Sequence, residues 1–163
     1  MSKPTAPKVT VSAVAERNGS YLTIEESIRG RRVLNQPAGH LENHESLTEA
    51  VARECFEESG WQFEPEYVLG IYCWEHPTKH FTILRIAFGG RAHSYEPGAI
   101  LDEGIVRALW MTPEEILAQT SRLRTPLVAQ ALVDHAAGHR YPLDLFSSVD
   151  LSVFDALRHH ATA

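Results

Sequence analysis

The segment from Ser46 to Gly60 constrains the fold most, because it encodes a helix whose apolar stripe ends in carboxylates. Residues 46–49 have the Ser-x-x-Glu form of a capping box and Gly60 is a favoured C-terminal residue, so we expect a helix between them. At about 100° per residue, three apolar side chains share a sector with three later glutamates: Leu47, Ala50 and Val51 with Glu54, Glu57 and Glu58. The face that should pack on the core therefore becomes acidic toward its end.

This acidic end is unfavourable unless something compensates it. Like charges at i+3 and i+4 repel, they stand at the negative end of the helix dipole, and they point toward a region of low dielectric. A hard divalent cation would compensate, because Mg2+ prefers carboxylate and carbonyl oxygens. The alternative is a charged surface helix with an acid network around Arg53, but a solvated face would lie opposite the stripe. We assign no histidine as a ligand, since no His spacing suits a tetrahedral zinc site.

The remaining chain predicts a mixed α/β or α+β architecture. Residues 9–15 and 21–25 alternate around an Asn18-Gly19 turn, which predicts a hairpin. Residues 67–75 and 81–88 should form two paired strands, and a loop over 94–104 should precede a short strand over 105–110. Further helices are expected from Thr112-Pro113 to about residue 120, from Thr125-Pro126 to Gly138, and, more weakly, over 150–158.

Length and composition restrict the function. A chain of 163 residues suits a single domain over 1–163, since one core commonly serves about 100 to 200 residues. A net charge of −6 has the wrong sign for a broad basic face that grips nucleic acid. Two cysteines cannot build a disulfide framework, the N-terminus lacks a signal-peptide core, and no apolar run approaches roughly 20 residues. We therefore expect a cytoplasmic protein without a membrane span or a nucleic-acid partner.

The acidic helix belongs to a longer motif that resembles the signature of the Nudix hydrolases, Gly-x5-Glu-x7-Arg-Glu-U-x-Glu-Glu-x-Gly-U. Seven fixed positions match, which is far more specific than a lone glycine-rich loop: Gly39, Glu45, Arg53, Glu54, Glu57, Glu58 and Gly60. Cys55 and Trp61 stand where the signature has bulky aliphatic residues. Both are apolar, so we expect altered packing behind the helix and not loss of the metal site. Residues 35–42, 123–128 and 140–143 are similar to the bacterial NudJ-type phosphatase branch of the family.

The resemblance implies an α/β/α sandwich with a mixed β-sheet and a core over about residues 8–143, while residues 144–163 have no assigned role. It also implies Mg2+-dependent hydrolysis, with Mn2+ able to substitute, in which water attacks phosphorus. The implied substrates are nucleoside tri- and diphosphates and related small pyrophosphates of the thiamine-pathway type. Carried over by position, the metal ligands are Glu54, Glu57, Glu58 and the carbonyl of Ala38. The structural positions are Gly39, Glu45, Arg53, which would pair with acids, and Gly60.

Other roles stay open at this point. The family pattern does not fix the general base, which could be Glu54 or a loop acid, Glu103 or Asp102. Arg31 is the candidate to meet a phosphate, and three aromatic residues are candidates to stack on a flat ring: Tyr72, Trp74 and Phe81. The oligomeric state could be monomer or homodimer.

Two rival functions have to be weighed against a hydrolase. One is a non-catalytic nucleotide-binding Nudix-fold regulator, but a pure binder has no physical need for so repulsive an acid cluster. The other is removal of an RNA cap or pyrophosphate, which needs a basic path for the chain that a net charge of −6 disfavours.

Overall fold

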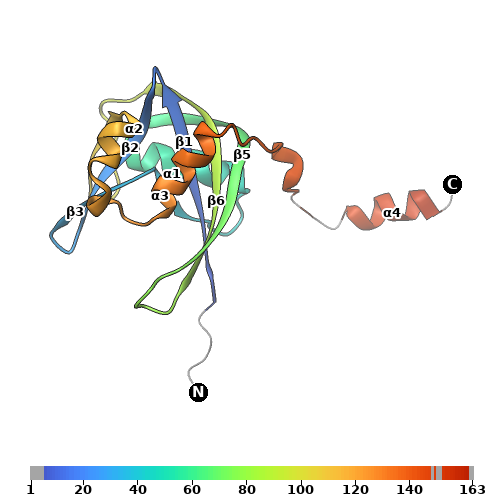
Figure 1. Cartoon of the computed structure of the whole chain (residues 1–163). Helices are drawn as coiled ribbons and strands as arrows, with labels where there is room; N and C mark the ends of the chain where they lie inside the picture. The colour runs from blue at the N-terminus through green and yellow to red at the C-terminus, as the bar shows by residue number, and fades with distance from the viewer. Residues whose placement is uncertain (1–5, 148, 150–151, 162–163) are drawn as a thin grey trace.

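The structure is a computed structural model that describes residues 6–147, 149 and 152–161. Within these residues it contains seven strands, four α-helices and two short 3-10 turns (Figure 1). The strands are β1 Lys8–Arg17, β2 Ser20–Ile28, β3 Arg31–Asn35, β4 Ala38–His40, β5 Trp61–Glu75, β6 Thr82–Tyr95 and β7 Ile105–Met111. The helices are α1 Leu47–Ser59, α2 Pro113–Leu117, α3 Leu127–Ala136 and α4 Val153–Ala161, with 3-10 turns η1 Thr120–Arg122 and η2 Leu143–Leu145.

The predicted hairpin of β1 and β2 is present, with Asn18 and Gly19 both at positive φ in the turn. The two strands pair only next to the turn, at Glu16↔Tyr21 and Arg17↔Ser20. Beyond it β1 runs parallel to β6 and antiparallel to β4, whereas β2 pairs with β3 and β7. The strand order β3-β2-β1-β6-β5 therefore contains parallel and antiparallel neighbours, which confirms the mixed sheet.

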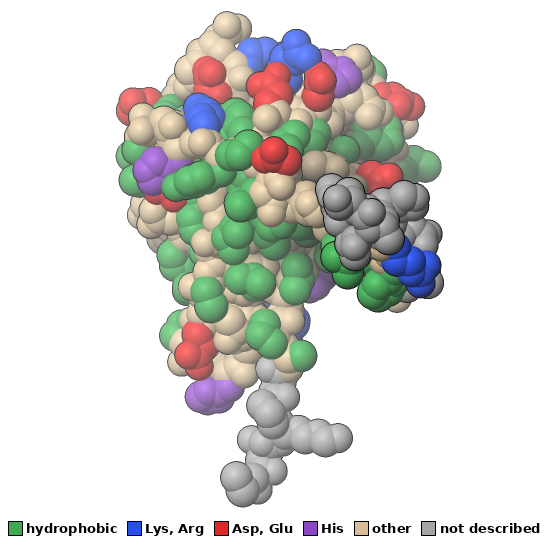
Figure 2. Space-filling view, turned by 90° about the vertical axis from the view of Figure 1, so that its right-hand side faces the viewer, with side chains coloured by type: hydrophobic (Ala, Val, Ile, Leu, Met, Phe, Trp, Pro, Cys, Tyr) green, Lys and Arg blue, Asp and Glu red, His purple; other side chains and the backbone are tan. Residues whose placement is uncertain are grey.

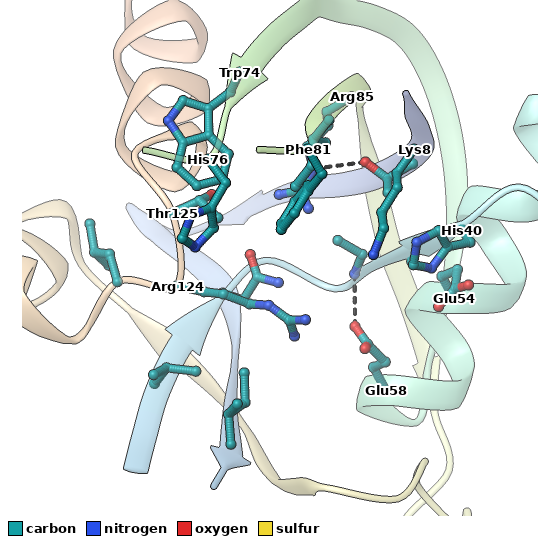
Figure 3. A pocket seen from close by; sticks show the side chains of 18 of the residues that line it. Lys8, His40, Glu54, Glu58, Trp74, His76, Phe81, Arg85, Arg124 and Thr125 are labelled. Atoms are coloured by element: carbon teal, nitrogen blue, oxygen red, sulfur yellow. Dashed lines mark hydrogen bonds between the residues drawn. The ribbon is translucent and has the colours of Figure 1, made fainter. Parts of the chain in front are cut away.

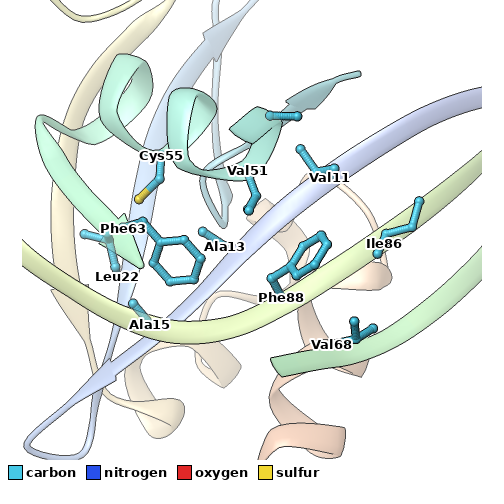
Figure 4. Close-up of a cluster of buried hydrophobic side chains, with 11 residues drawn as sticks. Val11, Ala13, Ala15, Leu22, Val51, Cys55, Phe63, Val68, Ile86 and Phe88 are labelled. Atoms are coloured by element: carbon cyan, nitrogen blue, oxygen red, sulfur yellow. The ribbon is translucent and has the colours of Figure 1, made fainter. Parts of the chain in front are cut away.

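Helix α1 covers one face of the sheet, and its predicted boundaries are confirmed. Ser46 and Glu49 form the reciprocal capping box, and Gly60 closes the helix in the left-handed conformation. Ala50, Val51 and Cys55 pack against side chains of β1, β2, β5 and β6, so the cysteine fills an aliphatic position (Figure 4). This packing fixes the rotation of α1 and thereby the direction of its acids.

A second apolar cluster covers the opposite face. It joins Val14 of β1 and Ala87 of β6 to Ile116 of α2 and to Ala131 and Leu132 of α3. Because successive residues of a strand point to opposite faces, β1 and β6 serve both clusters. Helices on both sides of a mixed sheet confirm the α/β/α sandwich.

Several boundaries differ from those expected. Strand β5 starts at Trp61, directly after the cap of α1, and β6 continues to Tyr95, because their antiparallel pairing runs on through register shifts. Pro65 is tolerated since β5 lies at the end of the strand order. Helix α2 ends at Leu117, before the predicted residue 120.

Helix α3 begins at Leu127, after the Thr125-Pro126 pair that was expected to open it. Thr125 does not cap the helix, because its Oγ1 is buried without a hydrogen-bond partner in the described part of the chain and Pro126 holds the cap position.

The end of the chain differs in character from the sandwich. Leu143 and Phe146 still pack on the first cluster, so packing continues slightly past residue 143. Helix α4 confirms the weak helical prediction over 153–158, whereas Ser152 lies in a turn and 150 and 151 lie outside the described residues. Figure 1 shows it apart from the sandwich, and Val153, Phe154 and Leu157 are exposed.

On the face drawn in Figure 2, the described Lys and Arg side chains are few and stand among acids and exposed apolar groups. A search of the described residues found no helix with the length and hydropathy of a membrane span.

The close approach of β5 and β6 at Gly90 yields a stability prediction. A Cβ at Gly90 would lie 2.1 Å from the carbonyl oxygen of Glu64, a backbone atom that cannot move aside. Gly90→Ala should therefore lower the free energy of unfolding by about 1–3 kcal/mol. Gly98→Ala is the matched control, because its Cβ would meet open space. Denaturant unfolding of both variants checks this, and equal stabilities would contradict it.

Candidate active site

A cavity of about 630 Å3 lies where the end of α1 meets the sheet (Figure 3). Its floor comes from neighbouring strands, where Thr10 of β1 is in register with Arg85 of β6, and Ile83 of β6 with Trp74 of β5. Glu54 and Glu58 enter from α1, and the loop before β7 contributes Asp102. The cavity thus has an acidic end on the helix and an aromatic end at Trp74.

Three carboxylates converge at the acidic end. One oxygen each from Glu54, Glu57 and Asp102 lie within 4.8 Å of one another. The backbone N–H of Asp102 donates to the carbonyl of Glu57 at 2.9 Å, which fixes the loop to the last turn of α1. Oxygen ligands at such spacing form a site that suits a hard divalent cation.

Arg53 holds this end together. Its Nε and Nη2 donate to the two oxygens of Glu45 at 2.9 and 2.7 Å, in the paired geometry that guanidinium and carboxylate favour. Its Nη1 donates to Glu54 Oε1 at 3.0 Å and to Glu57 Oε2 at 2.9 Å, and Nη2 also reaches the carbonyl of His40. Glu54 and Glu57 each keep a second oxygen that Arg53 does not contact.

Gly39 is required by the same packing. Residue 39 is in register with Val11 of β1, and a Cβ there would lie 2.1 Å from the carboxylate of Glu54. A larger residue would displace the Glu54 carboxylate from the position in which it accepts from Arg53.

Burial makes the acids of α1 electrostatically costly. Glu58 is 8% exposed, and its Oε2 accepts a hydrogen bond from the Ala38 N–H at 2.7 Å. Loss of solvation nevertheless raises the pKa of Glu58 to about 8, and burial also raises the pKa of Glu54 despite the neighbouring Arg53. Both groups are therefore poised to gain from a nearby positive charge.

The structure brings together some of the predicted residues and separates others. Arg31 and Trp74 line the cavity. Tyr72 does not reach it, because its hydroxyl donates to Asp134 Oδ2 at 2.7 Å and it lines a separate hollow beside α3. Of the two loop acids, Asp102 joins the carboxylates, whereas Glu103 is exposed and outside the cluster.

Sequence reasoning missed the cations of the floor. Lys8, Arg85 and Arg124 line the cavity. Phe81, one of the candidates for stacking, lines it as well. One signal was available for Arg85, since it is the single charged residue in the apolar run 83–88.

Comparison with known proteins assigns the chain to a family. The family model described as NUDIX domain matches residues 5–131. The chain belongs to the Nudix hydrolase family. This Nudix hydrolase is 41% identical to Phosphatase NudJ of Escherichia coli strain K12 over 139 residues, which are 85% of this chain and 90% of that protein.

Solved structures agree with this assignment. A Nudix hydrolase from Nitrosomonas europaea is 48% identical, with a TM-score of 0.87 over 90% of this chain and all of that one. The Nudix domain of Shewanella oneidensis NrtR, solved with ADP ribose, is 16% identical with a TM-score of 0.67 over 82% of this chain and 88% of that one. The latter supports the fold alone.

The buried Glu58 predicts how stability depends on pH in metal-free protein. Its folded pKa lies above the ordinary value of 4.5, so folding favours the protonated form. The corresponding stability is complete below about pH 4.5 and is lost as pH rises toward 8. In EDTA, Glu58→Gln should therefore exceed the wild type in stability at pH 8.5 by several kcal/mol, since each pKa unit corresponds to about 1.4 kcal/mol, and should match it near pH 4.5.

Thermal unfolding across this pH range is the measurement. Glu66→Gln, at an exposed position of β5, is the control and should show no such gain in stability. A Glu58→Gln variant that is less stable than the wild type at pH 8.5 would contradict the prediction.

Proposed function

We propose that this Nudix hydrolase cleaves pyrophosphate bonds of nucleoside tri- and diphosphates and related small pyrophosphates, with Mg2+ as the metal. The observation that carries the proposal is the convergence of Glu54, Glu57 and Asp102 within 4.8 Å at the end of a cavity large enough for a nucleotide. The similarity to Phosphatase NudJ supports a hydrolase that acts on a phosphate group.

The residues present fit a divalent cation. Carboxylate oxygens are the donors that Mg2+ prefers, and the raised pKa of Glu54 marks a buried acid whose charge lacks full compensation. Glu54, Glu57 and Asp102 would hold the ion, with Glu58 and the Ala38 carbonyl beside them. When bound, the cation neutralises pyrophosphate charge and polarises the phosphoryl oxygens.

The other groups orient and stabilise this end of the cavity. Arg53 keeps the carboxylates of Glu54 and Glu57 at a fixed spacing through its own hydrogen bonds. The attacking water is held by the cluster, and its proton passes to one of the carboxylates there. Because catalysis of phosphoryl transfer depends on positioning and charge, this rigidity is the main contribution of the helix.

The opposite wall supports a flat ring in the substrate. Trp74 and Phe81 line the cavity and flank His76, with ring centroids 5.4 and 5.1 Å from that imidazole. Stacking on such a surface tolerates any base. Tyr72 is left out of this proposal.

An activity screen tests the function. Nucleoside tri- and diphosphates, sugar nucleotides and thiamine pyrophosphate are incubated with and without Mg2+, with Mn2+ in parallel, and the products are separated. We expect activity only with metal, and kcat/KM values for ATP, GTP, CTP and UTP within about 30-fold of each other, or roughly 2 kcal/mol. Metal-independent hydrolysis, or none at all, would reject the proposal.

Variants of the acid cluster test the residue roles. Glu57→Gln and Asp102→Asn should each lower kcat by at least about 10²-fold, the scale for losing a group that stabilises transition-state charge. Glu103→Gln is the matched control for Asp102 and should stay near the wild-type rate. Glu57→Gln should also reduce the rise in Tm that Mg2+ produces, because linkage requires the metal to bind the native state. Equal losses at Asp102 and Glu103 would contradict this division.

A further inference from the structure

Arg85 is a buried cation without a carboxylate partner in the described part of the chain. It stands on β6 between Thr10 of β1 and Tyr72 of β5, in register with both. The residue is 5% exposed and lines the cavity. Its Nε donates to Thr10 Oγ1 at 3.3 Å, while its buried Nη1 has no acceptor among the described residues. A buried charge is costly unless a counter-ion balances it, so this position requires an explanation.

Neighbouring arginines differ from Arg85 in this respect. Arg124, which also lines the cavity, forms an ion pair with the buried Glu26. Arg107 of β7 and Arg122 of η1 both pair with Glu25 of β2. Burial lowers the pKa of Arg85 to about 10, with Arg124 adding to the effect, so the side chain is still a cation at neutral pH. Of these four arginines, Arg85 is the one without a carboxylate partner among the described residues.

Lys8 adds a second cation at the same place. Lys8 is in register with Ile83, two residues before Arg85, so both cations project from one face of the sheet. Its Nζ lies 4.8 Å from the ring centroid of Phe81 and has no ion pair within the described residues. Burial lowers the pKa of His40, and the charges of Lys8, Arg124 and Arg85 lower it further, which shows that positive charge converges here.

We propose that Arg85 and Lys8 form an anion subsite that binds a terminal phosphate of the substrate. Two cations match the two negative charges of a free phosphate end, and a guanidinium matches phosphate oxygens in paired geometry. An internal phosphate that is capped by a sugar carries a single charge and fits the subsite less well. In Figure 3, Arg85 and Phe81 lie between Trp74 on one side and Lys8, Glu54 and Glu58 on the other. This inference rests on the proposed function for the identity of the cavity as the substrate site, and it narrows the substrate class to pyrophosphates with a free phosphate end.

A matched pair of ligands tests the subsite without catalysis. ADP ends in a free phosphate, whereas ADP-ribose carries the same adenosine pyrophosphate with that end capped. Calorimetric titration in EDTA, with ligand up to the millimolar range, measures both affinities while no metal is present. The wild type should bind ADP at least about tenfold more tightly than ADP-ribose, a difference of about 1.4 kcal/mol.

Substitutions then assign the preference to residues. Arg85→Met should lower ADP affinity at least about tenfold and Lys8→Met at least about threefold, with ADP-ribose changed less than twofold in either. Arg91→Met is the control, because Arg91 lies on the same strand but is exposed and paired with Glu64 outside the cavity. Without ligand, the Tm of Arg85→Met should equal or exceed that of the wild type, since a buried unpaired charge is removed.

Other outcomes would overturn the subsite. If Arg85→Met loses affinity for ADP and ADP-ribose equally and also has a lowered Tm, the role of Arg85 is purely structural. If the wild type binds ADP and ADP-ribose equally well, or binds neither, the subsite is rejected outright. If Arg85→Met does not fold, Lys8→Met decides alone. Because the titration contains no metal, it remains valid even if the hydrolysis screen fails. If the enzyme hydrolyses nucleotides but binds ADP and ADP-ribose equally, only the subsite is rejected and the proposed function stands.

Discussion

The ion-pair network of Arg53 is the interaction on which the site depends. One guanidinium joins Glu45, near the end of the loop before α1, to Glu54 and Glu57 on the helix itself. It contacts the carbonyl of His40 as well, so β4, the loop and α1 are held as a unit. Because the apolar stripe of α1 is packed on the sheet, the helix cannot rotate to expose its acids. The Arg53 guanidinium therefore holds the carboxylates of Glu54 and Glu57 together, and their remaining negative charge favours a second cation.

The cavity exists because β1 changes partners along its length. After two residue pairs with β2, it continues between β4 and β6, and the two halves of the sheet separate. The small side chain of Thr10 leaves space in the cavity that a bulky side chain would fill. Gly39 lets the Glu54 side chain of α1 lie against β4. The hairpin turn at Asn18 and Gly19 depends on neighbouring residues alone, whereas the separation of the two halves of the sheet depends on how all the strands pair.

This distinction explains what the sequence could predict. The bounds of α1 followed from its capping box and Gly60, and the acidic sector followed from helical periodicity, because both are local. Asp102 could not be preferred over Glu103 in advance, since the choice depends on the N–H of Asp102 meeting the carbonyl of Glu57. Strand alternation correctly gave Tyr72 and Trp74 one face, but it could not show that Tyr72 would turn to Asp134 on α3.

A net charge of −6 says little about a cavity that is lined by both acidic and basic side chains. Buried acids on α1 and the unpaired Arg85 on β6 each cost stability in the empty protein, for the same reason: low solvation. Pairing them with each other would remove both costs, but no ion pair joins Arg85 to Glu54 or Glu58 within the described residues. Under the proposed function, a polyanion bound with a divalent cation would offset both costs at once, because the cation would meet the acids and the free phosphate end would meet Arg85. Metal and substrate should then favour each other's binding, since each relieves the charge that the other leaves unbalanced.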